Sequence, residues 1–417
     1  MVALCHPRHD SADVWRLQAD AIHLLPILRP LPLPNEETFD EVFSPQLLTA
    51  SAEAARPEVE REGSIVTETA GRKQEVMPKA WKAVGRMAGF LGVIVVLTFV
   101  TNAIITSGLR RIKTSAFGAS NQIMEGKVNV QVVITGSSRA LAHYDPRTIE
   151  AIAGRTAFNL GRNGSQTDMQ VAFLKVYLAH NRTPEVVVHN LDAFSFVTTR
   201  EVYDPVEYTP YLYDHELYDA LRKINPNIWK SRYLPLYGYV VEDMNFSWIR
   251  GLKGFLGWSP PEDYFLGFNP RSRKWTDDFK NLKASRPDGV RFEIEPAGIQ
   301  AVEELIRVCR GNGIQLIFVY SPEYIEMQSL TKNRAEVFDH FHQLADRFEV
   351  PLWDYSGWKY SGNQEFFQNS QHLNADGAAV FSMDVANRLR EYLAARSKAV
   401  GDLQASGGAV HSNVGQN

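Results

Sequence analysis

The sequence has few cysteines, no excess of basic residues and no phosphate-binding glycine loop, and each deficit excludes a class of protein. Its two cysteines, Cys5 and Cys309, are far apart in sequence, which excludes a disulfide framework and a cysteine-ligated zinc site. The formal net charge is −4, so the chain lacks the basic footprint of a nucleic-acid-binding protein. Neither a Walker-type loop nor a Gly-x-Gly-x-x-Gly motif follows a predicted strand. We therefore expect no cofactor, no metal and no nucleic-acid partner.

One segment is long and uncharged enough to cross a membrane. Met87–Leu109 (MAGFLGVIVVLTFVTNAIITSGL) contains no charged side chain, and its length suits a helix through a hydrocarbon core of about 30 Å. A buried core helix is the alternative, but such a helix normally carries a polar stripe. We therefore predict a transmembrane helix and, through it, a membrane partner.

Basic residues flank this segment on both sides, and more of them precede it than follow it. Those before it are Arg72, Lys73, Lys79, Lys82 and Arg86, and those after it are Arg110, Arg111 and Lys113. Because positive charge is retained on the cytoplasmic side, this bias predicts a cytoplasmic N-terminus. We therefore expect a single-pass protein of the inner or plasma membrane, with its C-terminal domain on the exported, periplasmic or extracellular side.

The two ends of the chain show no sustained hydrophobic period. Residues 1–80 mix Pro-rich runs with Glu/Ala/Arg-rich stretches, and residues 398–417 are rich in Gly, Ser and Asn. Both compositions are typical of disorder, so we predict a disordered N-terminal tail and a disordered C-terminal tail. Residues 115–397 remain as the folded domain.

Strand patterns and helix patterns alternate along this domain. The predicted strands are Lys127–Thr135, Thr156–Leu160, Glu185–Leu191, Gly313–Tyr320 and Val350–Asp354, and the predicted helices are Pro146–Ala153, Gln166–Ala179, Pro296–Arg310, Ala335–Phe348 and Ala375–Ala395. Strands separated by helices form a parallel sheet with helices on both faces. We predict an α/β fold, a flavodoxin-like three-layer sandwich with a five-stranded parallel sheet, preceded by one transmembrane helix.

An aromatic-rich insertion, residues 194–292, interrupts the alternation after the third predicted strand. One interpretation is a lid or platform beside an active site, since aromatic faces stack well on sugar rings. A second is a small subdomain that buries its own aromatic side chains. A third is that the stretch GLKGFLGW, residues 251–258, rests on the membrane surface, because Trp and Phe favour that interface.

Polar residues gather where the predicted strands end, which is where parallel sheets place their ligand crevice. They are Gly136-Ser137-Ser138, the loop 161–164, Asn190 with Asp192, Ser321 and Asp354, and His372 precedes the last helix. Acyl transfer needs an exposed hydroxyl at a strand-to-helix turn, backbone N–H groups for the oxyanion, and an imidazole within hydrogen-bond reach. The stretch VVITGSSRA offers such a turn, although two serines that cap a helix would give the same pattern.

These blocks resemble the ordered motifs of SGNH (GDSL-type) hydrolases. The likeness extends over about residues 127–395 without most of the insertion, and it is strongest in HLNADGAAVFS and in GSSR after a buried strand. It is closer to the membrane-anchored branch that includes alginate O-acetylation and teichoic-acid D-alanylation proteins. The resemblance implies Ser138 as nucleophile, His372 as general base, and an oxyanion hole from the N–H groups of Ser138 and Gly164 with the amide of Asn190.

Two positions depart from the family pattern: Ser137 stands for an aspartate before the nucleophile, and Asn369 stands for the aspartate three residues before the histidine. An amide can orient an imidazole but brings no charge. Another carboxylate, Asp354, Glu365 or Asp376, would then support the base, or a Ser-His pair would work slowly, or the site is degenerate.

Two hypotheses follow for the function. The first is an exported, membrane-tethered esterase or O-acyltransferase acting on an acyl ester of a cell-envelope or extracellular glycan, with a membrane protein as a possible acyl donor. A lipase or thioesterase of the same fold differs from it only in substrate. The second is a catalytically degenerate protein of this fold that binds or assembles a polysaccharide machinery.

Overall fold

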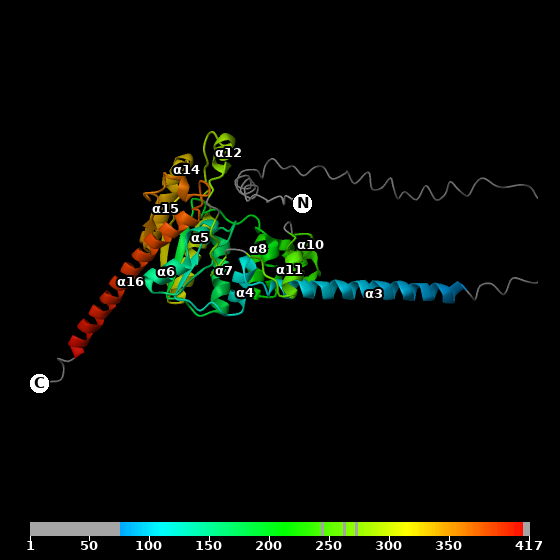
Figure 1. Cartoon of the computed structure of the whole chain (residues 1–417). Helices are drawn as coiled ribbons and strands as arrows, with labels where there is room; N and C mark the ends of the chain where they lie inside the picture. Colours follow the sequence, from blue (N-terminus) through cyan, green and yellow to red (C-terminus); the bar gives the residue numbers. More distant parts are fainter. Residues whose placement is uncertain (1–75, 243–245, 262–263, 272–273, 412–417) are drawn as a thin grey trace, which may run out of the picture. The chain divides into compact units, whose positions relative to one another are not determined.

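The parallel sheet forms the middle layer of the folded domain in a computed structural model of the chain (Figure 1). The structure describes residues 76–411 except 243–245, 262–263 and 272–273, with the backbone alone at 76–80 and 400–411. Residues 1–75 of the predicted N-terminal tail, and 412–417 of the predicted C-terminal tail, lie outside the described residues. The chain divides into two units, Met1–Val96 and Leu97–Asn417.

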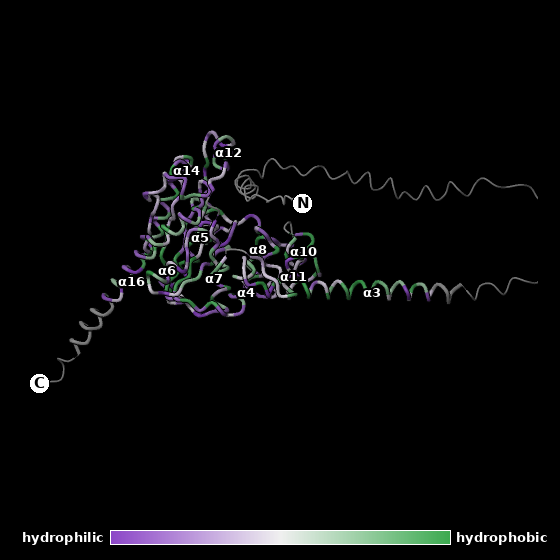
Figure 2. The backbone as a smooth tube through the Cα atoms, viewed as in Figure 1, coloured by the Kyte–Doolittle hydropathy of each residue, from purple (hydrophilic) through white to green (hydrophobic). Residues whose placement is uncertain are grey.

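Helix α3, Val76–Leu109, contains the predicted span and begins eleven residues before it. By length and composition, Trp81–Leu109 could cross a membrane, and most of the apolar side chains between Met87 and Val100 are exposed. Figure 2 shows this stretch of α3 as largely hydrophobic.

The five strands lie in the order β2-β1-β3-β4-β5, and all their pairings are parallel. Their bounds are β1 Val132–Thr135, β2 Ala157–Asn159, β3 Val186–Leu191, β4 Gln315–Tyr320 and β5 Leu352–Asp354. This is the strand order of flavodoxin-like doubly wound sheets. The predicted fold class is confirmed.

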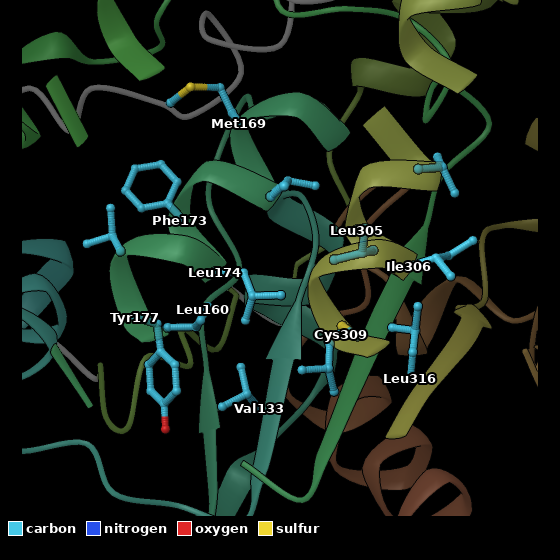
Figure 3. Packing of buried hydrophobic residues seen from close by; sticks show 14 of the residues in the cluster. Val133, Leu160, Met169, Phe173, Leu174, Tyr177, Leu305, Ile306, Cys309 and Leu316 are labelled. Atoms are coloured by element: carbon cyan, nitrogen blue, oxygen red, sulfur yellow. The ribbon is translucent and has the colours of Figure 1, made fainter. Parts of the chain in front are cut away.

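Helices cover both faces of the sheet. One face carries α4 Ser115–Met124, α7 Thr167–His180, α13 Pro296–Gly311 and α15 Arg334–Arg347, and the other carries α5 Ser138–His143, α6 Pro146–Ala153, α14 Ile325–Leu330 and α16 Ala375–His411. Successive strand side chains point to opposite faces, so Val133 packs on the first set and Val132 on the second. Figure 3 shows Val133 and Leu316 beneath Leu174 of α7 and Leu305 of α13.

Local signals set several element ends where the sequence predicts them. At α6 the Asp145 side chain accepts a hydrogen bond from the Arg147 N–H, Pro146 occupies the first turn, and Gly154 closes the helix in the left-handed region. These three residues explain why the predicted bounds of this helix agree with the structure.

Two predicted boundaries are wrong. The first strand begins at Val132 and not at Lys127, because the Val128 N–H donates to the Asn181 side chain at 2.9 Å and so is not available to a neighbouring strand. Helix α16 continues past Ala395 to His411, so residues 398–411 are helical where a tail was predicted.

The insertion follows β3 and consists of short helices. They are η2 Pro205–Glu207, η3 Thr209–Tyr211, α8 His215–Ile224, η4 Pro226–Ile228, α9 Trp229–Tyr233, α10 Tyr237–Val240, α11 Ser247–Phe255 and α12 Asp278–Ser285. Tyr208, Tyr211 and Tyr218 belong to the same buried cluster as Phe173 and Leu174 of α7. The first part of the insertion therefore extends the main core instead of forming a core of its own.

Candidate active site

The turn between β1 and α5 presents Ser138. Gly136 has a φ of +145°, and a Cβ there would lie 2.7 Å from the Ala140 Cβ and 2.8 Å from the Asn190 Cβ. Only glycine fits this backbone without strain. Ser137 caps α5, accepting a hydrogen bond from the Arg139 N–H at 3.2 Å, and Ser138 is the first helical residue. The alternative of a serine cap thus holds for Ser137, which leaves the Ser138 hydroxyl for another partner.

That partner is His372. The Ser138 Oγ lies 2.9 Å from His372 Nε2, although the two residues are 234 positions apart in the chain. His372 sits in a tight loop before α16, closed by the Gln368 N–H donating to the His372 carbonyl at 2.9 Å. A distance of this size is within the range needed for direct proton transfer between hydroxyl and imidazole.

Asn369 fixes the tautomer of His372. Its Oδ1 accepts hydrogen bonds from the N–H groups of Gln371 (3.1 Å) and His372 (2.9 Å), so the atom that faces the ring must be the oxygen. The same oxygen lies 3.0 Å from His372 Nδ1. Because an amide oxygen only accepts, Nδ1 carries the proton and Nε2 keeps its lone pair for the Ser138 hydroxyl. The loop thus orients the base as a catalytic carboxylate would, without a charge.

The three carboxylates that the sequence offered as support for the base are exposed, whereas His372 is 1% exposed. Asp354 accepts hydrogen bonds from Ser356, and Glu365 accepts from Asn363. Asp376 lies on the first turn of α16, where its N–H donates to Asn374. The structure therefore brings Asn369, and not Asp354, Glu365 or Asp376, to the buried Nδ1 atom.

Burial and two cations act on the base. Burial lowers the pKa of His372 well below its usual value, and the positive charges of Arg271 and Arg139 lower it further. His372 is therefore neutral at pH 7, the form that can accept a proton from Ser138. The imidazolium that would form in a reaction is disfavoured by the same causes.

A second buried histidine, His143, holds the His372 loop and escaped the sequence analysis. Its Nε2 accepts a hydrogen bond from the Leu373 N–H at 3.0 Å, and its Nδ1 lies 2.9 Å from the Ser321 Oγ. Burial lowers the pKa of His143, and the charges of Arg139 and His372 lower it further. The ring of His143 therefore stays neutral, and its Nε2 can accept the hydrogen bond from the Leu373 N–H. His143 is a positioning residue, five residues after Ser138 on α5.

Arg139 joins the carboxyl ends of β3 and β4 to the turn between β1 and α5. Its guanidinium lies 3.1 Å from Asp192, with both side chains almost fully buried, and it donates to the carbonyls of Ser321 and Pro322. Its ring contact with Tyr320, at 4.8 Å from the ring centroid, fixes it from a third side. A buried pair of this kind anchors the α5 N-terminus, because removal of one partner would leave an uncompensated charge.

The predicted oxyanion hole is only partly assembled. The Ser138 N–H lies at the start of α5, and Gly164 lies in the loop after β2 with a φ of +63°. Asn190 is wrong as a donor: its Nδ2 donates to the Leu191 carbonyl and to Asp192, while its Oδ1 accepts from the Tyr144 hydroxyl. Asn190 lies within β3, as it does within the predicted strand Glu185–Leu191, and the direction of its amide is set by these side-chain contacts.

A later part of the insertion is bonded to the elements that carry Ser138 and His372. The Asn269 N–H donates to the Leu141 carbonyl at 3.1 Å on α5, and the Thr276 N–H donates to the Gln368 carbonyl at 2.9 Å in the histidine loop. Between them, Arg271 donates to the Asn163 Oδ1 at 2.6 Å. Ser138 is 1% exposed in this arrangement. We call the described residues 264–271 and 274–276 the covering segment. Arg271, like His143 and Arg139, had no motif that marked it in the sequence.

A small cavity is lined by the chain neighbours of the paired residues. It holds about 10 Å³, room for one water molecule, and its lining includes Arg139, next to Ser138, and Gln371, next to His372. Ala193, Phe194, Phe292, Glu323 and Met327 complete the lining.

Comparisons with known proteins were made for the whole chain. The sequence matches no protein-family model and no curated protein. One similar solved structure is described as a putative acylhydrolase from Bacteroides fragilis, with 10% identity, 63% of this chain and 87% of that chain covered, and a TM-score of 0.31. Another is a GDSL-like lipase from Bacteroides thetaiotaomicron, with 8% identity, 67% and 100% covered, and a TM-score of 0.31. At these values neither structure assigns an activity to this chain.

Proposed function

We propose that this protein is a membrane-tethered serine esterase or O-acyltransferase that acts through Ser138 and His372. The observation that carries the proposal is the 2.9 Å contact between the Ser138 Oγ and an imidazole nitrogen whose lone pair is directed by Asn369. The sequence resemblance to SGNH hydrolases, stated from GSSR and HLNADG, supports the same residues.

The reaction begins with attack of the Ser138 Oγ on the ester carbonyl carbon while its proton moves to His372 Nε2. The N–H groups of Ser138 and Gly164 stabilise the negative oxygen of the tetrahedral intermediate, and the Arg271 cation favours the same charge. Collapse of the intermediate breaks the bond to the leaving alcohol, which takes the proton from Nε2. Water or a sugar hydroxyl then attacks acyl-Ser138, giving hydrolysis or transfer, and the proton of the attacking group returns through Nε2 to the Ser138 Oγ.

Asn369 predicts a slow enzyme. In a Ser-His-Asp protease, replacing the aspartate by asparagine lowers kcat by about 10⁴-fold. There the asparagine leaves the histidine in the wrong tautomer, whereas here the amide oxygen selects the useful one. We therefore expect a loss of kcat smaller than about 10⁴-fold, caused only by the absence of a negative charge beside the imidazolium.

The substrate class follows from the location and the surface. Helix α3 is long and apolar enough to anchor the chain, and the basic flank before it favours an exported domain. The insertion also exposes the aromatic side chain of Tyr213, and an exposed ring of this kind suits a sugar ring. We propose an O-acylated glycan of the cell envelope or outside the cell as substrate, with a membrane protein as acyl donor if the enzyme transfers.

The first test is hydrolysis of p-nitrophenyl acetate by the full-length protein in detergent. We expect Ser138→Ala to abolish turnover, because this substitution removes the proposed nucleophile, whose Oγ lies 2.9 Å from His372 Nε2. The matched control is Ser137→Ala, which removes the cap of α5 at a cost of about 0.5–2 kcal/mol in stability but leaves the nucleophile. Turnover that survives Ser138→Ala unchanged would refute the assignment.

A second candidate function is a catalytically degenerate protein that binds or assembles a polysaccharide machinery. The observation that favours it is the neutral Asn369 in the position of a carboxylate. Under this alternative the wild type is silent, and restoring the charge at position 369 leaves it silent.

A further inference from the structure

The exposed apolar side chains of the folded domain concentrate in one part of the insertion. Among the described residues after Val100, fourteen large hydrophobic side chains are exposed, and eleven of them lie between positions 229 and 258. The most exposed are Leu256 (85%), Val240 (68%), Phe246 (63%) and Val241 (60%). Apolar patches of this kind on soluble domains mark interaction surfaces. We call the exposed side chains of residues 229–258 the apolar collar.

The apolar collar is built against the last turns of α3. The Leu236 N–H donates to Asn102 at 2.9 Å, and the Tyr239 hydroxyl lies 2.8 Å from the Thr106 hydroxyl. Helix α11 approaches α3 so closely that a Cβ on Gly108 would lie 1.7 Å from the Gly251 carbonyl oxygen. Figure 1 shows α10 and α11 beside the C-terminal end of α3.

Counting residues along α3 places these contacts at a membrane boundary. A helix needs about 20 residues to cross a hydrocarbon core of about 30 Å. The uncharged run ends at Arg86 on one side and Arg110 on the other, so any such span includes Asn102, Ile105 and Thr106 in its last turns. The segment that carries the collar contacts these positions through Leu236, Tyr239 and Gly251, and therefore lies at the depth of the bilayer interface.

The chemistry of the collar suits that depth. Two aromatic side chains of the collar, Trp258 and Phe255, each have a cation over the ring. Lys253 lies 5.1 Å from the Trp258 ring centroid, and Arg111 lies 4.9 Å from the Phe255 ring centroid. Aromatic rings beside Lys and Arg are typical of the membrane–water interface, where the cations reach the headgroups. The aliphatic members, Leu256 and Val240, gain by entering the acyl region.

We propose that the apolar collar inserts into the lipid interface of the membrane that α3 crosses, so that the domain is attached by a second, peripheral contact. This inference rests on the proposed span of α3 and is independent of the proposed catalysis.

The test places an environment-sensitive fluorophore on single cysteines of the full-length protein in phosphatidylcholine–phosphatidylglycerol vesicles. The background is Cys5→Ser, with Cys309 retained because it is fully buried and burial raises the pKa of its thiol to about 12. Leu256→Cys reports on the collar. Ile325→Cys, on an exposed residue of α14, is the matched control, and Leu91→Cys reports on the span.

We expect brominated lipids to quench the label at positions 256 and 91 and not at 325. Quenching at 91 without quenching at 256 would overturn the collar and leave the span. Loss of quenching at both would overturn the span and the collar with it. A label at 256 that is shielded from water but not quenched by brominated lipid would show that a protein covers this surface, which also overturns the proposal.

Discussion

At the residue scale, the chemistry of the site depends on a neutral amide beside a buried imidazole. The Asn369 Oδ1 accepts hydrogen bonds from two backbone N–H groups and from the ring N–H of His372. These bonds fix both the conformation of the loop and the tautomer of the ring. It contributes no charge to an imidazolium that burial, Arg271 and Arg139 already disfavour. The base is therefore well oriented but weak.

This balance predicts the effect of Asn369→Asp. A carboxylate at this position stabilises the imidazolium, so the pKa of His372 rises and kcat for ester hydrolysis increases by at least about 10-fold, toward the 10⁴-fold that the reverse change costs in a protease. In the wild type, kcat/KM should fall on acidification only well below pH 6.5, because His372 is protonated only below its lowered pKa. We call this fall the acid limb of the pH profile. In the variant the limb moves to higher pH.

The pH profile of kcat/KM for both proteins is the measurement. An unchanged limb together with unchanged turnover would mean that His372 is not the base. A wild type and a variant that are both silent would favour the binding protein.

A buried histidine outside the site makes a separate prediction about stability. Burial lowers the pKa of His189 to about 3, while its Nδ1 lies 2.8 Å from the Thr135 hydroxyl. Below pH 6.5 the unfolded chain binds a proton at this residue that the native protein does not, so the free energy of unfolding falls as pH decreases from 6.5 toward 3. At pH 5 the loss from this residue is about 2 kcal/mol.

Urea unfolding of the detergent-solubilised protein at pH 7 and pH 5 measures this loss, and His189→Leu should make the difference between the two pH values smaller by about that amount. The quantity compared is the change in the free energy of unfolding between pH 7 and pH 5 within each protein. Any destabilisation that the substitution causes at pH 7 therefore cancels. An equal pH difference in both proteins would contradict a neutral native His189.

At the element scale, the sheet brings the polar ends of its strands together and the covering segment closes over them. Both faces of the strands are packed by helices, so the free ends at β1, β3 and β4 are the positions left for polar chemistry. The covering segment bonds to α5 at Leu141, to the β2 loop at Asn163, and to the histidine loop at Gln368.

Arg271→Gln tests the electrostatic effect of the covering segment. Loss of its positive charge removes one cause of the low pKa of His372, so the acid limb of kcat/KM shifts to higher pH. The control is Arg291→Gln, an exposed arginine paired with Glu336. The same limb in Arg271→Gln and wild type would show that Arg271 does not act on the base.

At the scale of the whole molecule, local rules predicted the fold and long-range geometry completed the site. Buried β-branched runs and helix caps, such as Asp145-Pro146 with Gly154 at α6, predict the alternation from which the parallel sheet follows. The rule that strand ends share one edge also predicts that Ser138 and His372 lie near each other.

The rest of the site depends on where side chains point, which strand and helix patterns do not specify. The hydrogen bond between His143, at the end of α5, and Ser321, after β4, joins distant parts of the chain, and Arg271 reaches Asn163 from an insertion without a motif. Asn190 lies inside both the predicted and the observed strand, and only the structure shows that its amide donates to Leu191 and Asp192.

The most direct test of the account is covalent trapping of the nucleophile. A small alkyl phosphonofluoridate reacts with a serine hydroxyl that a neighbouring base activates, forming the serine–phosphorus bond and releasing fluoride. On the full-length protein, peptide mass spectrometry should find one phosphonyl group, on Ser138, with the rate lowered at least about 100-fold in His372→Ala. A folded wild-type protein that remains unlabelled at Ser138, or labelling that is equally fast without His372, would contradict it.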